Sequence, residues 1–164
     1  MRLSDFLKKL NKLEKSYIIL FALSLLAGIL YGLLDKDYFK CCENVIGVPQ
    51  EGTSTLKIFT GNYLLSLTEL FTAGLSSLYF NFHTFSVTSS YLSSRQELFA
   101  LPVVFFIGVF ELAGGLFLAL TGLIFAEKLL KIKSKLKPKE LFLYGTALIF
   151  FGAVVEYLLL SMVV

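Results

Sequence analysis

The chain has 164 residues, of which 56% are hydrophobic and only 16% are charged, and its net charge is +3 at pH 7. A soluble domain carries roughly 25% charged residues, so this composition excludes an ordinary soluble domain. Stretches of about 20 apolar residues are typical of membrane spans. The composition therefore predicts an all-α, polytopic helical membrane protein. Its lysines flank the apolar stretches and follow from membrane topology, so the lipid bilayer and not a nucleic acid is the expected partner.

The N-terminal segment, residues 1–16, combines apolar and basic residues. Its leucines and one phenylalanine recur at helical spacing with lysines opposite, which predicts an amphipathic helix on the membrane surface. A basic lead-in that only orients the first span is an equal alternative. The apolar run 17–34 ends in Asp35-Lys36-Asp37 without a small-x-small cleavage site, which favours an uncleaved anchor over a signal peptide. We expect residues 17–164 to form a single transmembrane domain.

Further elements follow in chain order. A polar loop, 35–57, contains the adjacent cysteines Cys41 and Cys42, which pair poorly with each other and suit a redox-labile pair or bridges between chains. We predict a second span at 58–80, a short polar helix at 82–94 with a short apolar one at 98–107, a helix at 108–126 and a last span at 141–164. A lysine-dense loop, 127–140, precedes the last span.

Charge asymmetry determines the number of crossings. Cytoplasmic loops carry the excess of Lys and Arg, so the N-terminal segment and the 127–140 loop are both expected in the cytoplasm. Two segments on the same side of the membrane are separated by an even number of crossings. Because the first two spans bring residue 81 back to the cytoplasm, two passes are required between 81 and 126. We predict five crossings, the third (82–107) discontinuous, with a new helix beginning near Gly108 and a multi-pass location in the cell membrane. Four spans plus a re-entrant hairpin is the alternative.

Three glutamates interrupt the apolar segments. Glu69, Glu111 and Glu156 each lie on the smallest or most polar stripe of their helix, which indicates that they point into the bundle. No Lys or Arg lies at comparable depth, so the acids require one another, free backbone N–H groups, water, a cation or protonation. The candidate polar partners are Asn62, Asn81 and His83. A proton or cation pathway and neutral glutamates that hydrogen-bond across helices are both open interpretations.

Glycine stripes predict close helix contacts. Ser24, Gly28 and Gly32 form a small-xxx-small series. Glycine recurs every seven residues at Gly108, Gly115 and Gly122, and the last span adds Gly145 and Gly152.

Enzymatic motifs are absent from the sequence. It contains no H-E-x-x-H, no G-x-S-x-G, no Walker or dinucleotide glycine pattern and no aspartate after Asp37. His83 is the only histidine, and a lone histidine among Ser and Thr is more often an interior group than a ligand. We therefore expect no catalytic residue, no metal and no cofactor.

The order of elements resembles the stage II sporulation protein M family of integral membrane proteins. Asn62 in IFTGNYLLSL, Asn81 in YFNFHTFSVTSSYL, and Gly108, Glu111 and Leu112 in IGVFELAGG carry the resemblance, which covers about residues 15–164. Two positions depart from the family pattern. Phe82 stands where the family usually has glycine, and Ile107 stands where it usually has histidine. If that histidine normally partners the glutamate, Glu111 needs another partner, for which His83 is a candidate.

The resemblance implies a scaffold. The bacterial namesake holds peptidoglycan-remodelling hydrolases together during engulfment, and some other members are similar to partners of transport systems. The leading hypothesis is a non-enzymatic membrane subunit that self-associates, as a homodimer, or scaffolds membrane or extracytoplasmic proteins through its glycine faces. The alternative is a small channel or transporter whose glutamates line a cation or proton path.

Overall fold

The computed structural model describes residues 3–42, 54–96 and 101–163. Within these ranges the chain is helical, with no strand, and the prediction of an all-α fold is confirmed. The elements are α1 (Leu3–Lys9), α2 (Lys12–Leu34), the 3₁₀ helix η1 (Tyr38–Cys42), α3 (Thr55–Phe71), α4 (Leu75–Ser94), α5 (Leu101–Leu129) and α6 (Pro138–Val163).

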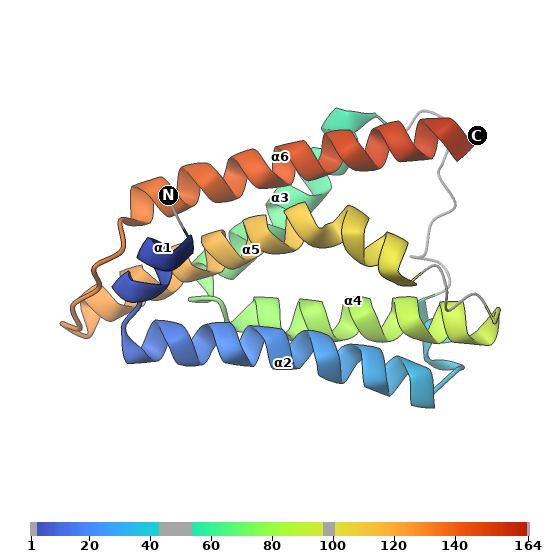
Figure 1. Cartoon of the computed structure of the whole chain (residues 1–164), viewed down its shortest axis with the longest axis horizontal. Coiled ribbons are helices and arrows are strands. Elements are labelled where there is room, and N and C mark those ends of the chain that lie inside the picture. The colour runs from blue at the N-terminus through green and yellow to red at the C-terminus, as the bar shows by residue number, and fades with distance from the viewer. Residues whose placement is uncertain (1–2, 43–53, 97–100, 164) are drawn as a thin grey trace.

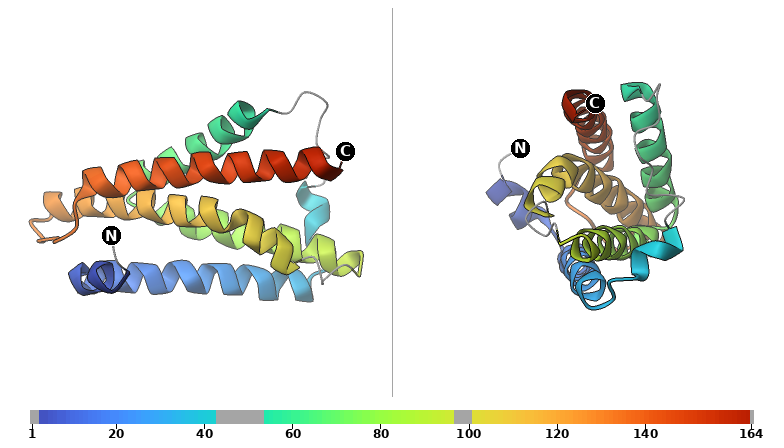
Figure 2. Two further views of the ribbon diagram at one scale, coloured as in Figure 1. Left: turned by 45° about the horizontal axis from the view of Figure 1, so that its top comes forward. Right: turned by 90° about the vertical axis from the view of Figure 1, so that its right-hand side faces the viewer.

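The five longer helices, α2 to α6, form an elongated bundle (Figures 1 and 2). α2 packs along α4, α5 packs along α6, and α3 contacts both α5 and α6. Helices α2, α4 and α6 run in one direction, and α3 and α5 run back (Figure 1). As a consequence, the start of α2, the α3–α4 turn and the α5–α6 loop lie toward the same end of the bundle.

Three helices of the described chain are long and apolar enough to cross a membrane. They cover Lys12–Leu34, Gly108–Leu129 and Pro138–Leu158. Many of their large apolar side chains, such as Leu30 and Phe150, are exposed on the outside of the bundle. This outward apolar surface agrees with a membrane protein, because lipid is the solvent that such side chains prefer.

The predicted continuous span at 58–80 is wrong. α3 ends at Phe71, the chain turns through Ala73 (φ 53°) and Gly74 (φ 83°), and α4 begins at Leu75. Glycine adopts a positive φ without steric cost, and the Gly74 N–H donates to the Glu69 carbonyl at 2.7 Å, which closes the end of α3. Tyr17 of α2 donates its hydroxyl to the Gly74 carbonyl at 2.9 Å and holds this turn against α2.

The predicted break between the polar helix 82–94 and the apolar helix 98–107 falls where α4 ends, next to residues 97–100, which lie outside the described residues, whereas the predicted junction near Gly108 is absent. α4 continues through Phe82 to Ser94, in agreement with the predicted end of the polar helix, and residues 101–107 belong to α5. α5 passes through Gly108 without interruption, so no helix begins there. A single glycine costs a helix only about 1 kcal/mol. Pro102 is tolerated at the start of α5, because a backbone N–H in the first turn would have no carbonyl partner within the helix.

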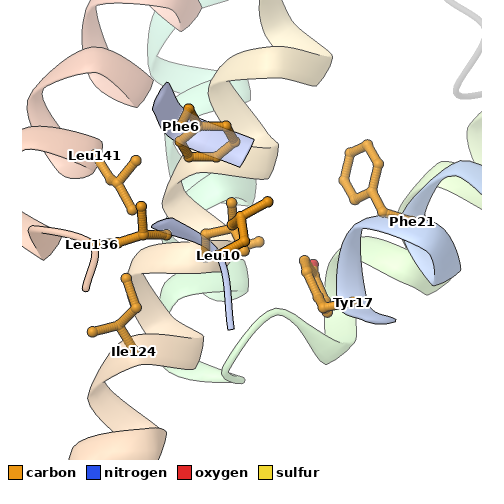
Figure 3. Close-up of a cluster of buried hydrophobic side chains, with 9 residues drawn as sticks. Phe6, Leu10, Tyr17, Phe21, Ile124, Leu136 and Leu141 are labelled. Carbon is orange, nitrogen blue, oxygen red and sulfur yellow. The ribbon is translucent and has the colours of Figure 1, made fainter. Parts of the chain in front are cut away.

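The N-terminal segment divides into two helices. Asn11 caps α2, and its side chain and that of Glu14 form a reciprocal capping box, so α2 begins at Lys12 and not at residue 17. Phe6 and Leu10 are buried in a cluster with Ile124, Leu136 and Leu141 (Figure 3). The apolar face predicted for the membrane surface therefore contacts α5, α6 and the loop between them.

Candidate functional site

A cavity of about 360 Å³ lies between the helices. Its lining residues come from α2 to α6, so the packing of the whole bundle creates it. Five of the six polar residues predicted to face the interior line this cavity: Asn62, Glu69, Asn81, Glu111 and Glu156. Ser66, Thr84 and Thr88 add hydroxyl groups. The sequence prediction that the three acids point into the bundle agrees with this arrangement.

Glu111 lies between side chains from two other helices. The Asn62 amide of α3 donates a short hydrogen bond to Glu111 Oε1, and the carboxyl group of Glu156 on α6 lies within hydrogen-bond reach of Glu111. Gly152 makes room for this group, since a Cβ at that position would lie 2.6 Å from Glu111 Cγ. Two carboxyl groups form a hydrogen bond only when one of them carries a proton, so the pair is suited to holding a proton.

Glu111 therefore does not use a helix N-terminus, which is a correction to the predicted junction. α5 begins at Leu101, and Glu111 lies well inside it, where the backbone N–H groups are already paired within the helix. His83 is not its partner either. The polar partners of the Glu111 carboxyl group are Asn62 and Glu156, which come from distant parts of the chain.

Glu69 occupies a second position in the cavity. Its side chain packs against Gly115 of α5, where a Cβ would lie 3.0 Å from Glu69 Oε2. Glu69 and Asn81 are each only 7% exposed. Within the described structure, Glu69 Oε2 and Asn81 Nδ2 have no hydrogen-bond partner. An unpaired buried polar atom costs about 1–3 kcal/mol, so these two atoms indicate that water or a bound group meets them.

His83 lies outside the cavity lining. Its Nδ1 is 3.0 Å from the hydroxyl of Tyr38 in η1, and its ring stacks on Tyr79 with centroids 5.8 Å apart. The prediction that His83 partners Glu111 is wrong, and its place among the residues of the polar pathway is not supported, although the half-buried ring has a polar partner. Its signal in the sequence was only that it is polar and lies close to Asn81.

The electrostatic character of the cavity is acidic. Between residues 58 and 126 the chain has a single Lys or Arg, Arg95. This residue caps the end of α4, and its guanidinium lies over the Tyr91 ring, 5.2 Å from the centroid. Aromatic and aliphatic side chains, including Phe21 and Phe85, complete the wall. The lining thus offers oxygen acceptors and no fixed positive charge.

The predicted glycine contacts occur within the chain. A Cβ on Gly28 would lie 2.5 Å from the Phe82 carbonyl oxygen, one on Gly32 would meet the Ser86 backbone, and one on Gly122 would meet the Leu70 backbone. Gly145 faces Gly114, where its Cβ would lie 2.9 Å from the carbonyl oxygen. Gly108 differs, since no described atom would lie within 4 Å of its Cβ, and it lines the cavity instead.

A second group of buried acids, which sequence analysis missed, lies at the end of the bundle near the lysine-rich loop. Glu14 and Glu127 are fully buried. Asn11 Nδ2 donates to Glu127 Oε1 at 2.8 Å, the Asn11 N–H donates to Glu14 Oε2 at 2.7 Å, and Ser134 Oγ donates to Glu14 Oε1 at 2.5 Å. The available signal was the Asn11-x-x-Glu14 capping pattern. These contacts join α2, α5 and the loop before α6.

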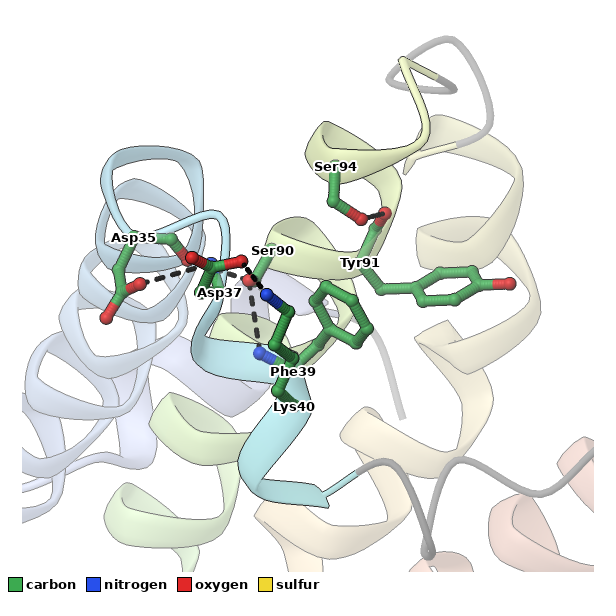
Figure 4. A network of polar contacts seen from close by, with 7 residues as sticks. All are labelled: Asp35, Asp37, Phe39, Lys40, Ser90, Tyr91 and Ser94. Carbon is green, nitrogen blue, oxygen red and sulfur yellow. Dashed lines mark hydrogen bonds and ion pairs between the residues drawn. The ribbon is translucent and has the colours of Figure 1, made fainter.

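At the opposite end, η1 is held against α4 by Ser90 (Figure 4). Ser90 Oγ donates to the Asp35 carbonyl at 2.7 Å and accepts from the Phe39 N–H at 3.2 Å, and Lys40 pairs with Asp37 at 2.7 Å. Cys41 and Cys42 are the last residues of η1, and their redox role stays a prediction. These contacts fix η1 and the end of α2 against α4.

Metal chemistry gains no support from the described residues. They contain no group of three or more His, Cys, Asp or Glu side chains that could hold a metal ion. The three cavity glutamates are divided between the Glu111–Glu156 pair and Glu69.

No protein-family model, curated protein or solved structure matches the chain. The resemblance to the stage II sporulation protein M family therefore stays a prediction.

Proposed function

We propose that this chain is a five-crossing membrane protein that moves cations or protons through its acidic cavity. α2 to α6 are the crossings, and the N-terminus and the 130–137 loop lie on the cytoplasmic side. The alternating helix directions support this topology, because they bring both lysine-rich segments to one end of the bundle (Figure 1). At 1.5 Å per residue, the 17 residues of α3 and the 20 of α4 span about 26 and about 30 Å, close to the ~30 Å hydrocarbon core.

The observation that carries the proposal is the convergence of Glu69, Glu111 and Glu156 on one cavity in which two buried polar atoms are unpaired. Ionisable residues inside a membrane are costly and mark ion pathways or proton relays in many transporters. A purely structural role requires only hydrogen bonds between the helices, and gives no reason for a cavity that three acids line.

The glycine contacts do not support the scaffold hypothesis. It required glycine faces that are free to contact other chains, whereas Gly28, Gly32, Gly122 and Gly145 contact helices of the same chain. A homodimer and partner proteins remain expectations from the family resemblance. They are the outcome favoured if transport is absent.

The test is proton and monovalent-cation flux in proteoliposomes. We expect Glu111→Gln to reduce flux at least tenfold, because it removes the proton-binding carboxyl and keeps the size of the side chain. The matched control is Glu140→Gln, since Glu140 is exposed and pairs only with Lys137 on the surface. This control is expected to retain the flux of the unmodified protein. Absence of flux from the unmodified protein, together with a stable co-purifying partner, would overturn the transport proposal in favour of the scaffold.

A further inference from the structure

We infer that the cavity binds a small organic ammonium ion with a short apolar body. This inference rests on the proposed function, for which it names the class of substrate. It follows from the size of the cavity, the distribution of its acids and the character of its walls.

Size argues against a single bare metal ion. A cavity of about 360 Å³ lies at the lower end of the roughly 300–1,000 Å³ typical of small-molecule sites. A dehydrated metal ion instead requires six to eight oxygen ligands converging at about 2.0–2.6 Å. The described residues contain no such cluster of acids, so the cavity fits a small molecule better.

The three acids reach the cavity from three helices, α3, α5 and α6. Glu111, Glu156 and Asn62 form one polar group, and Glu69 lies beside Gly115, one helical turn further along α5. An ammonium group has several N–H donors and no acceptor, and so needs neighbouring carboxylates. No Lys or Arg is among the residues that line the cavity.

The walls suit the apolar body of such a ligand. Phe21 and Phe85 are buried at 6% exposure and line the cavity together with Phe80, Leu65 and Leu112. Aromatic faces attract cations, and aromatic walls combined with acids are the general means of recognising organic ammonium groups. An inorganic cation has no apolar body to place against these aliphatic and aromatic walls.

The unpaired polar atoms provide the independent evidence for a ligand. Glu69 and Asn81 are 93% buried by their 7% exposure, and Glu69 Oε2 and Asn81 Nδ2 meet no hydrogen-bond partner in the described chain. Glu69 Oε2 is an acceptor for an ammonium N–H. The Asn81 amide can present either its oxygen or its nitrogen to the cavity, because the two orientations have the same shape.

The experiment is titration calorimetry of the full chain in lipid nanodiscs. Its three probes share one apolar chain and differ in the charge of the head group. The probes are n-butylammonium, 1-butanol and pentanoate, in which the same butyl chain carries a positive, a neutral and a negative head. We expect n-butylammonium to bind and the other two probes not to bind. Glu69→Gln and Glu111→Gln should each weaken n-butylammonium binding about tenfold, since a charge-assisted hydrogen bond is replaced by a neutral one, whereas Glu140→Gln should leave it unchanged.

Equal binding of the three probes, or no binding of n-butylammonium, would overturn the inference. This comparison uses the unmodified protein and does not depend on the folding of any variant. Failure here is distinguishable from failure of the proposed function. Proton flux that depends on Glu111, without n-butylammonium binding, would retain the function and reject the substrate class. Binding of n-butylammonium without flux of any cation would retain the binding inference and reject the transport function.

Discussion

Replacing Gly32 by valine is expected to be the most damaging single change in the bundle. A Cβ at position 32 would collide with the Ser86 carbonyl oxygen and Ser89 Oγ, and would lie 2.8 Å from the Ser90 backbone nitrogen. Backbone atoms of α4 cannot move aside without separating α2 from α4. Overpacking typically costs 1–3 kcal/mol, and we expect a loss of about 3 kcal/mol in unfolding free energy here, measured by denaturation in detergent micelles.

The control for this change is Gly61→Val. Gly61 also lies in a helix, α3, but no described atom would lie within 4 Å of its Cβ. We expect this variant to unfold with nearly the same free energy as the unmodified protein. Equal destabilisation by Gly32→Val and Gly61→Val would mean that α2 and α4 do not pack as closely as described.

Removing the Glu14 carboxyl is the change with the second largest expected effect. Glu14→Ala leaves the Asn11 N–H and the Ser134 hydroxyl without the acceptor that each has now. Loss of a helix cap costs about 0.5–2 kcal/mol, and a buried unpaired group about 1–3 kcal/mol. We expect Glu14→Ala to lower the unfolding free energy by about 2–3 kcal/mol and to speed trypsin cleavage in the 130–137 loop.

The conservative variant separates hydrogen bonding from charge. Glu14→Gln keeps an acceptor oxygen and the side-chain shape, so its loss should stay below about 1 kcal/mol. If Glu14→Gln were as damaging as Glu14→Ala, the negative charge and not the hydrogen-bond network would hold this end of the bundle.

Composition and stripe analysis predicted the apolar segments around 17–34 and 141–164, because α2 and α6 are uninterrupted and strongly apolar. The same analysis placed Glu69, Glu111 and Glu156 on inward faces, since lipid excludes acids whatever the details of packing. These predictions depend on local sequence alone, which explains their agreement with the structure.

The errors concern features that depend on tertiary contacts. The α3–α4 turn was missed because the residues on both sides of Gly74 are as apolar as a continuous span, and the turn is held by Tyr17, which lies 57 residues away. The predicted junction at Gly108 failed because a glycine that opens a cavity has the same sequence signal as one that ends a helix. The choice of Asn62 as the partner of Glu111 depends on how α3 packs against α5, which stripe periodicity cannot determine.

The central claim is that an acidic, water-accessible cavity lies within the bilayer, and a single buried thiol tests it most directly. Ser66 lines the cavity and is 7% exposed, whereas Leu64 on the same helix is 58% exposed and faces outward. Ser66→Cys and Leu64→Cys would each be made in a Cys41→Ser, Cys42→Ser background. Each would then be treated in native membranes with methanethiosulfonates of similar size and opposite charge.

We predict that the thiol at position 66 reacts at least tenfold faster with the cationic than with the anionic reagent, because the three glutamates concentrate positive charge in the cavity. The thiol at position 64 should react with neither, because lipid surrounds it and prevents formation of the thiolate. A thiol at position 66 that is inert to both reagents, or that reacts at equal rates with both, would contradict the account.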